Sequence, residues 1–205
     1  MLDTSICDPG NPDLVACFGF DKGTTLDGSQ YGNDLLPFGV SYVEGASGLA
    51  VQTTAASTLR TSNHSSLRSD SFTLEAWIRP SQSPSMMDGK RAAIIANPGR
   101  YGLFLYPNDR IHCSSGGSVS AYAALPANEW THLACTLEGE TLTLWINGWR
   151  GPSAQVSGPP GMRDNGQLTI AGSVDGDELT GAIDNVRVFR TARSASEIAD
   201  AAGLR

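Results

Sequence analysis

In the segment Phe72-Thr73-Leu74-Glu75-Ala76-Trp77-Ile78, every second side chain, starting from Phe72, is apolar. The positions between them are occupied by Thr73, Glu75 and Trp77. The segment Thr141-Leu142-Thr143-Leu144-Trp145-Ile146 follows the same rule. This period is that of a β-strand with one face in a core. Further runs of this kind predict strands at residues 15–20, 92–96, 102–105, 110–113, 131–137, 167–170 and 182–189.

Turn signals separate these runs. Glu138-Gly139-Glu140 closes one predicted hairpin, and Asn147-Gly148 is a strong type I′ signal for another. No helical run lies between the strands, so the pattern predicts an all-β chain folded as a two-sheet antiparallel sandwich. Residues 151–166, rich in glycine and proline, are expected to form a long surface loop. One short C-terminal helix is expected, because Ser194 and Glu197 form a capping box.

The composition is that of a globular protein and restricts the possible partners. The chain has 205 residues, of which 40% are hydrophobic, and a formal net charge of −7. This negative charge disfavours nucleic acid or an anionic membrane surface as the main partner. No run approaches the roughly 20 apolar residues that a membrane-spanning helix needs. No signal peptide is visible either.

The four cysteines indicate two disulfides and an oxidising compartment, so a secreted, cell-surface or periplasmic protein is expected. They permit three pairings, and proximity along the chain favours Cys7 with Cys17 and Cys113 with Cys135. Buried free thiols are the alternative. The second pair is expected to join neighbouring strands.

The expected organisation is a single domain with a short extension before it. Residues 1–13 precede the first predicted strand and would be pinned to it by Cys7. The domain itself is expected to span residues 14–205.

Eight motifs stand in a fixed order along the chain: Leu14-Val15-Ala16-Cys17-Phe18-Gly19-Phe20-Asp21, Asp27-Gly28-Ser29, Gly32-Asn33, residues 45–50, 72–80, 130–134, 144–148 and 181–188. Their order and spacing resemble the laminin-G-like, concanavalin-A-like jelly-roll domains of secreted bacterial proteins, over about residues 14–203. The resemblance implies two antiparallel sheets in a jelly roll and often one structural calcium ion. It also implies a carbohydrate-binding, lectin-like or adhesive module attached to a larger secreted protein.

Asp184 is the first candidate for holding that calcium ion. It lies in phase with Val186 and Val188, so its carboxylate is expected to point toward the core, where it needs a cation. Calcium takes oxygen ligands from carboxylates, amides and carbonyls. The resemblance extends the role more loosely to two further residues, and a turn aspartate adds a third, so the candidates are Asp184, Asp21, Asn33 and Asp27. In the alternative, Asp27 and Asn33 only hydrogen-bond their own turns and Asp184 pairs with an arginine.

Sugar rings present apolar C–H faces, so aromatic side chains near the surface are the candidates for binding them. Trp149 directly follows the Asn147-Gly148 turn and is expected near a hairpin tip, where an exposed ring invites a binding role. The alternative is that Trp149 packs under the loop that follows it. Tyr101, Tyr106 and Tyr122 are weaker candidates.

Enzyme signatures are mostly missing from the sequence. His64, His112 and His132 are scattered, and His132 is expected to be structural. No predicted strand offers the carboxylate pair of a retaining glycosidase, and Asp175–Glu178 reads as a solvated turn. The sequence therefore predicts a non-catalytic extracellular module that binds a glycan or another extracellular polymer. The alternatives are a protein-interaction or adhesion domain of the same fold and, less favoured, a cryptic glycoside hydrolase or lyase.

Overall fold

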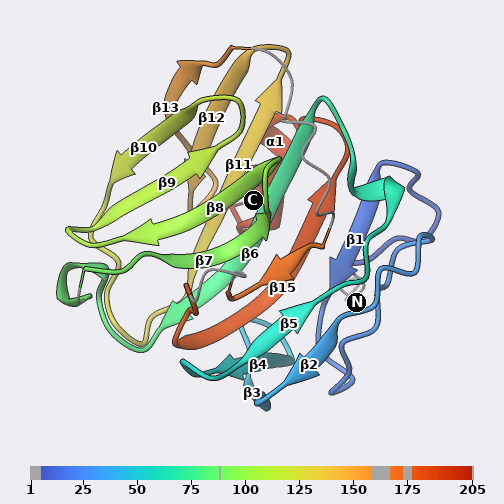
Figure 1. Ribbon diagram of the computed structural model, residues 1–205, viewed down its shortest axis with the longest axis vertical. Coiled ribbons are helices and arrows are strands. Elements are labelled where there is room, and N and C mark those ends of the chain that lie inside the picture. The colour runs from blue at the N-terminus through green and yellow to red at the C-terminus, as the bar shows by residue number, and fades with distance from the viewer. Residues whose placement is uncertain (1–5, 88, 158–166, 173–176, 205) are drawn as a thin grey trace.

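The computed structural model describes residues 6–87, 89–157, 167–172 and 177–204, and within them two antiparallel sheets pack face to face (Figure 1). The eight-stranded sheet has the order β13 (Trp149–Gln155), β12 (Thr141–Ile146), β11 (Thr131–Glu138), β6 (Phe72–Pro80), β15 (Gly181–Phe189), β4 (Leu49–Thr53), β3 (Ser41–Glu44), with β1 (Leu14–Phe18) also paired to β15. The seven-stranded sheet has the order β10 (Ser118–Tyr122), β9 (Arg110–Ser114), β8 (Tyr101–Tyr106), β7 (Ala92–Asn97), β14 (Thr169–Ile170), β5 (Thr58–Arg60), β2 (Leu36–Phe38). The predicted jelly-roll sandwich is confirmed.

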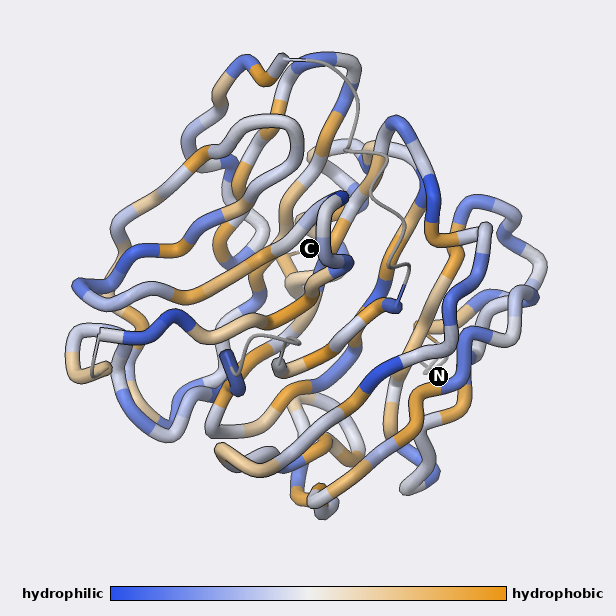
Figure 2. Tube along the Cα trace, in the orientation of Figure 1, coloured by the Kyte–Doolittle hydropathy of each residue, from blue (hydrophilic) through white to orange (hydrophobic). Residues whose placement is uncertain are grey.

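The core lies between the two sheets, as the alternation predicts. Leu74 and Ile78 of β6 point inward, as do Leu103 and Leu105 of β8. Figure 2 shows hydrophobic and hydrophilic residues alternating along many of the strands. Burying one face of each strand removes apolar area from water, which is the main favourable contribution to folding.

Both predicted disulfides are present, but the strands that one of them joins lie in opposite sheets and are not the neighbours expected from the sequence. Cys7 is bonded to Cys17, which ties the N-terminal segment to β1. Cys113 is bonded to Cys135 with a Cα–Cα distance of 6.3 Å. Cys113 lies on β9 and Cys135 on β11, so this bond crosses the core from one sheet to the other and does not join neighbours in one sheet.

The described residues include three short helical segments: α1 (Ala195–Ala201) and the 3₁₀ turns η1 (Ser65–Leu67) and η2 (Pro84–Met86). The capping box of α1 is confirmed, because Ser194 and Glu197 each accept a hydrogen bond from the other's backbone N–H. Ile198 of α1 packs on Ala134 and Trp145, so the helix covers part of the outer face of the eight-stranded sheet. No helix within the described residues has the length and apolar character that crossing a bilayer requires.

Two sequence expectations are corrected by the strands. Residues 151–155 belong to β13 and are not a loop, while residues 158–166 lie outside the described residues. The phase of Asp184 is also reversed. The pairing of β15 with β6 loses register between Asp184 and Arg187, and Asn185 has a φ of 50°. This bulge turns Val186 into the core and leaves Asp184 on the opposite face of the strand.

Candidate functional site

Asp184 lies on the outer face of the eight-stranded sheet, yet it is fully buried because the loop between β3 and β4 covers it. Its Oδ2 accepts hydrogen bonds from the backbone N–H groups of Ala46 (2.9 Å) and Ser47 (3.1 Å). Its Oδ1 accepts one from Asn185 (2.7 Å). A Cβ at Gly45 would lie 2.6 Å from Oδ2, so glycine is needed for the loop to approach this closely.

Asp21 approaches the same loop from the segment after β1. Its Oδ1 accepts a hydrogen bond from the backbone N–H of Leu49 (3.1 Å), and a Cβ at Gly48 would overlap that oxygen. Burial raises the pKa of Asp184 to about 6, and the negative charge of Asp21 adds to this rise. The structure therefore brings Asp21 and Asp184 together.

Asn185 adds an oxygen that the sequence analysis missed. Its Oδ1 is buried without a hydrogen-bond partner in the described part of the chain, while its Nδ2 donates to Ser47 Oγ (3.2 Å). Asp21, Asp184 and Asn185 offer oxygen atoms only, which is the ligand type that calcium takes. No group of three or more His, Cys, Asp or Glu side chains within the described ranges is arranged to hold a metal.

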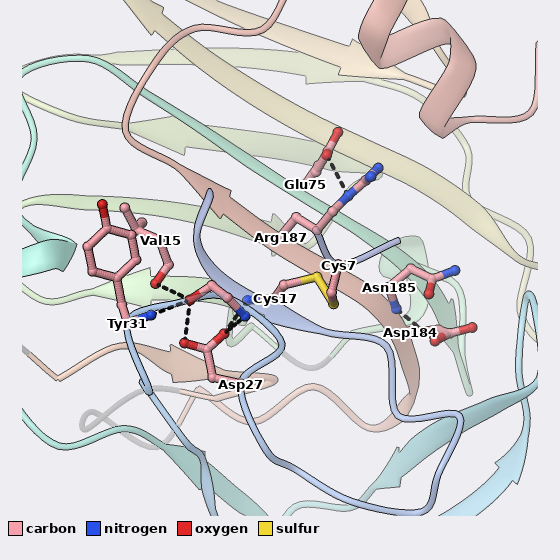
Figure 3. Close-up of a disulfide and its surroundings, with 10 residues drawn as sticks. Cys7, Val15, Cys17, Asp27, Tyr31, Glu75, Asp184, Asn185 and Arg187 are labelled. Atoms are coloured by element: carbon pink, nitrogen blue, oxygen red, sulfur yellow. Dashed lines mark hydrogen bonds and ion pairs between the residues drawn. A yellow bond between two sulfur atoms is a disulfide. The ribbon is translucent and has the colours of Figure 1, made fainter. Parts of the chain in front are cut away.

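Asp27 and Asn33 do not join this group, so their candidacy as metal ligands is corrected. Asp27 Oδ1 accepts from the N–H groups of Cys17 and Ser29, and its Oδ2 accepts from the N–H of Asn33 (2.8 Å). Asn33 in turn donates to the carbonyl oxygen of Val15 (2.6 Å). In Figure 3, Asp27 and Asp184 lie on opposite sides of the Cys7–Cys17 bond. Asp27 bonds its own turn as in the alternative, but Asp27 and Asn33 also tie the loop to β1. The arginine partner that the alternative gave Asp184 is not seen in the described residues, where its donors are backbone N–H groups.

Tyr101 is also corrected as a ligand-binding candidate. Its ring is buried 5.0 Å from that of Phe72, and its hydroxyl donates to the carbonyl oxygen of Leu67 (3.1 Å). Burial raises the pKa of Tyr101 to about 12. The side chain is part of the core, and only its edge reaches the lining of the pocket beside Phe104.

Trp149 and Tyr122 are both exposed, but they lie on different sheets. Trp149 is 71% exposed at the start of the edge strand β13, so it does not pack under a following loop. The preceding turn has φ angles of 48° at Asn147 and 79° at Gly148, as the type I′ signal predicts. Tyr122 is 74% exposed at the end of the edge strand β10.

The outer face of β8, β9 and β10 carries a row of large side chains that includes Tyr122. The cross-strand register sets Tyr122 opposite Arg110, and Arg110 opposite Tyr106. The guanidinium carbon of Arg110 lies 4.2 Å from the centre of the Tyr106 ring. This is cation–π geometry. The row therefore places a positive charge against the Tyr106 ring and leaves the Tyr122 ring exposed at its end.

The adjacent row on the same strands consists of Ser120, His112 and Phe104. His112 Nδ1 lies 2.8 Å from Ser120 Oγ, and the His112 ring centre lies 5.2 Å from that of Tyr106. The guanidinium carbon of Arg91 lies 4.5 Å from the centre of the Phe104 ring. The two rows together form what we call the aromatic face: Phe104, Tyr106, Arg110, His112, Ser120 and Tyr122.

A pocket of about 320 Å³ opens beside Phe104, between the β7–β8 turn and the β9–β10 turn. Its lining includes Asn97, Arg100 and Ser115. The Nε of Arg100 and the Oγ of Ser115 are buried and have no hydrogen-bond partner among the described residues. Buried polar atoms without partners are costly, so a ligand rich in hydroxyl groups would be favoured here.

A larger cleft of about 580 Å³ runs along the Cys7–Cys17 bond and is lined by both Asp21 and Asp27. Its aromatic lining residue, Phe20, is buried, so its ring face is not available for stacking. The cleft lacks the combination of ring faces and unpartnered polar atoms that the aromatic face and its pocket provide.

Glu75, on β6, is the centre of a buried ionic cluster on the outer face of the eight-stranded sheet. Its Oε1 lies 2.8 Å from Arg187 Nε and 2.7 Å from Arg193 Nη1. His132 Nε2 lies 3.8 Å from Glu75 Oε2. Burial lowers the pKa of His132 to about 3, with the charges of the two arginines adding to the effect, so the imidazole is neutral at pH 7. Glu75 and His132 are sealed from solvent, as a structural role requires.

Solved structures of the same fold include a domain of an arabinanase and the binding domains of two toxins. Domain 4 of AbnA, an extracellular GH43 arabinanase from Geobacillus stearothermophilus, matches with a TM-score of 0.76 and 19% identity over 93% of this chain and 98% of that chain. The binding domain of Paraclostridial Mosquitocidal Protein 1 has a TM-score of 0.73 and 18% identity over 93% of this chain and 52% of that one. The receptor binding domain of botulinum neurotoxin mosaic serotype C/D has a TM-score of 0.72 and 15% identity over 94% and 51%. The chain thus spans about half the length of these two toxin domains, and identities this low show a shared fold alone.

No curated protein sequence matches the chain. A family model does: Laminin_G_3, described as the concanavalin A-like lectin/glucanases superfamily, matches residues 53–199. That segment is more than half of the chain and includes most of both sheets. The resemblance drawn from the sequence motifs is therefore confirmed, and the chain belongs to the concanavalin A-like lectin/glucanases superfamily.

Proposed function

We propose that this domain is a non-catalytic glycan-binding module whose ligand lies on the outer face of the seven-stranded sheet. The observation that carries the proposal is that the Tyr106–Arg110–Tyr122 row shares one sheet face with Phe104, which lines a pocket with unpartnered buried polar atoms. Sugars need ring faces for their C–H groups and hydrogen-bonding partners for their hydroxyls. Binding sites for small ligands combine apolar surface with a few fixed polar groups in this way.

The comparisons support a binding role at the level of the fold. The AbnA domain was solved in complex with arabinotriose, and the toxin neighbours are binding or receptor-binding domains. The two disulfides and the extracellular origin of the AbnA domain support a secreted or cell-surface location. We propose the same setting here, with the domain as one module of a larger secreted protein.

A role without catalysis is supported by the state of the carboxylates. Glu75 is buried in ion pairs with two arginines. Asp177, which lies beside the aromatic face, is ion-paired with Arg91 at 2.6 Å. Neither is held opposite a second carboxylate in the way that a retaining glycosidase requires.

Replacing Tyr122 with alanine is expected to weaken glycan binding about tenfold or more, the cost of removing one well-placed aromatic contact. The melting temperature should stay unchanged, because the side chain is exposed. The measurement is a glycan array that includes neutral arabinan, xylan, galactan and glucan oligosaccharides, followed by calorimetric titration of the tightest binder.

Trp149→Ala is the matched control, since it removes an equally exposed ring from the other sheet. Loss of affinity in this variant, with Tyr122→Ala binding normally, would move the site to the β12–β13 edge, where the sequence first pointed. Absence of binding to every glycan would remove the proposed function.

A protein-interaction or adhesion role remains the second candidate, and one surface favours it. Leu36 and Phe38 of the edge strand β2 are 62% and 69% exposed. Neighbouring exposed apolar side chains on a sheet edge are typical of protein contact surfaces. Adhesion that survives Tyr122→Ala and is lost in Phe38→Ser would support this candidate.

We further propose that calcium binds between the loop after β1 and the β15 bulge. The carboxylates of Asp21 and Asp184, with Oδ1 of Asn185, would hold the ion. When bound, calcium supplies a positive charge that offsets the repulsion between two neighbouring carboxylates. Its role would be structural, because it ties the first and last strands of the sheet together.

Calcium is therefore expected to raise the melting temperature relative to EDTA. An ion that binds only the native state stabilises it by about 2.7 kcal/mol at 100 times its dissociation constant. The difference should vanish in Asp184→Asn and in Asp21→Asn, and should persist in the exposed control Asp70→Asn. An unchanged wild-type melting temperature with and without calcium would overturn the calcium proposal.

A further inference from the structure

Three arginines surround the aromatic face and its pocket, although the chain as a whole has a net charge of −7. Arg91 and Arg100 line the pocket, and Arg110 lies over Tyr106. The pocket-lining residues within the described ranges include no aspartate or glutamate. The positive charge is therefore a local feature of this face and is opposite in sign to the rest of the molecule.

Two carboxylates lie nearby, and both are engaged. Asp177 is ion-paired with Arg91. Asp109, on the β8–β9 turn, accepts hydrogen bonds from the backbone N–H of Ser85 (3.0 Å) and the hydroxyl of Ser83 (3.2 Å). One of the three guanidinium groups therefore has a carboxylate against it, whereas Arg100 and Arg110 form no ion pair with a carboxylate among the described residues.

Arg100 gives the strongest indication of an anionic ligand. Its Nε is buried without a hydrogen-bond partner among the described residues, and the hydroxyl of Ser115, which lines the same pocket, is in the same state. Arginine recognises carboxylates through paired, charge-assisted hydrogen bonds, and these are stronger than those between neutral groups. A carboxylate in the pocket would satisfy Arg100 Nε and Ser115 Oγ together.

His112 lies among these arginines and adds no positive charge of its own. Burial lowers its pKa, and the positive charges of Arg110 and Arg91 lower it further. The imidazole is thus neutral at pH 7 and leaves the arginines as the source of positive charge on this face.

We infer that the glycan bound here is acidic, with one uronic acid carboxylate at Arg100 in the pocket and a further one at Arg110, where a sugar ring stacks on Tyr106 or Tyr122. The inference rests on the proposed glycan-binding function and narrows it to one chemical class. Sugar stacking and carboxylate recognition need an aromatic ring and a guanidinium group side by side, and the Arg110–Tyr106 pair provides both.

The test compares polysaccharides that differ only in charge. Polygalacturonate, alginate and hyaluronate are each titrated against their carboxyl-reduced forms, which keep the linkages and replace the acid with a neutral sugar. At least one acidic form should bind about tenfold or more tightly than its reduced form, as expected for losing a charge-assisted hydrogen bond. That preference should weaken as salt concentration rises.

Variants separate the charge from the ring. Arg100→Gln and Arg110→Gln should each reduce affinity for the acidic form about tenfold and leave the reduced form nearly unaffected. Arg110→Lys keeps the charge and serves as the conservative variant if Arg110→Gln folds poorly. Arg150→Gln on the exposed edge strand β13 removes one charge from the other sheet and should change neither affinity.

The outcomes distinguish this inference from the proposed function. Equal binding of acidic and reduced forms, or binding of neutral glycans alone, would overturn the acidic ligand and leave the glycan-binding function standing. No binding to any acidic or neutral polysaccharide would overturn both. A charge preference that survives both arginine-to-glutamine variants would also contradict the assignment.

Discussion

Replacing Glu75 with alanine should lower the free energy of unfolding by about 3–5 kcal/mol, because it leaves buried arginines without their counter-charge. The Glu75 carboxylate is fully buried between Arg187 of β15 and Arg193 of the segment that leads into α1. The Arg193 backbone N–H also donates to Thr73 Oγ1 (2.8 Å). Loss of Glu75 should therefore loosen the packing of the C-terminal segment as well as the centre of the sheet.

Urea unfolding measures this loss, with Glu138→Ala as the control. Glu138 is an exposed carboxylate at the end of β11, and its removal should change stability by no more than about 0.5 kcal/mol. Replacing Glu75, Arg187 and Arg193 together with apolar residues of similar size should recover much of the loss, as seen when buried ion pairs are exchanged whole. A loss below about 1 kcal/mol for Glu75→Ala would show that the cluster is not the ionic centre described here.

Removing the Cys113–Cys135 bond is expected to cost about 3 kcal/mol or more. Its 22-residue separation implies about 3 kcal/mol of lost constraint on the unfolded chain. Both cysteines are completely buried in the core, so replacing them with alanine also leaves unfilled space between the sheets. The expected result for Cys113→Ala/Cys135→Ala is a large fall in the unfolding midpoint.

Cys7→Ala/Cys17→Ala is the matched comparison. That bond closes a separation of 10 residues and ties only the N-terminal segment to β1, so its loss should cost less. The measurement is guanidinium unfolding of both double variants beside the reduced wild type. An equal or smaller loss for the core pair would contradict the view that this bond holds the two sheets together.

The strands of the sheet interior could be predicted from the sequence, whereas several edge strands could not. β6 and β12 have one face in the core, so their side chains alternate clearly. β2 and β3 are exposed along almost their whole length, and β13 is mostly exposed. A strand with no buried face has no reason to alternate, so its sequence carries no periodic signal.

The candidate sites divide in the same way. The sequence identified Asp184 as a carboxylate that is costly to bury. It could not show to which face of the sheet the side chain points, because the bulge at Asn185 reverses the alternation of β15. Asparagine tolerates a positive φ, so the Asp184-Asn185 pair held a signal that alternation alone overlooks. Tyr101 was predicted as a surface ligand-binding residue, but on β8 it shares the inward face with Leu103 and Leu105. Its neighbour Gly102 points outward instead.

The aromatic face was only partly foreseen, through Tyr122 and the weaker candidate Tyr106. Arg110 and His112 alternate with the buried Ile111 and Cys113, so their outward direction was present in the sequence. Their meeting with Tyr106 depends on the register between β8 and β9, which no single strand reveals.

The two sheets differ in how freely their outer faces can change, and this makes the domain a natural scaffold for engineering. The central strands of the eight-stranded sheet are partly covered by α1 and by the N-terminal segment, so the outward residues beneath them contribute to stability. On the other sheet, Tyr106, Arg110, His112, Ser120 and Tyr122 lie on regular strands and are only partly buried or exposed. A library randomised at these five positions would retain the disulfide-linked core while sampling new ligand specificities, so that recognition could be evolved with little change in foldability.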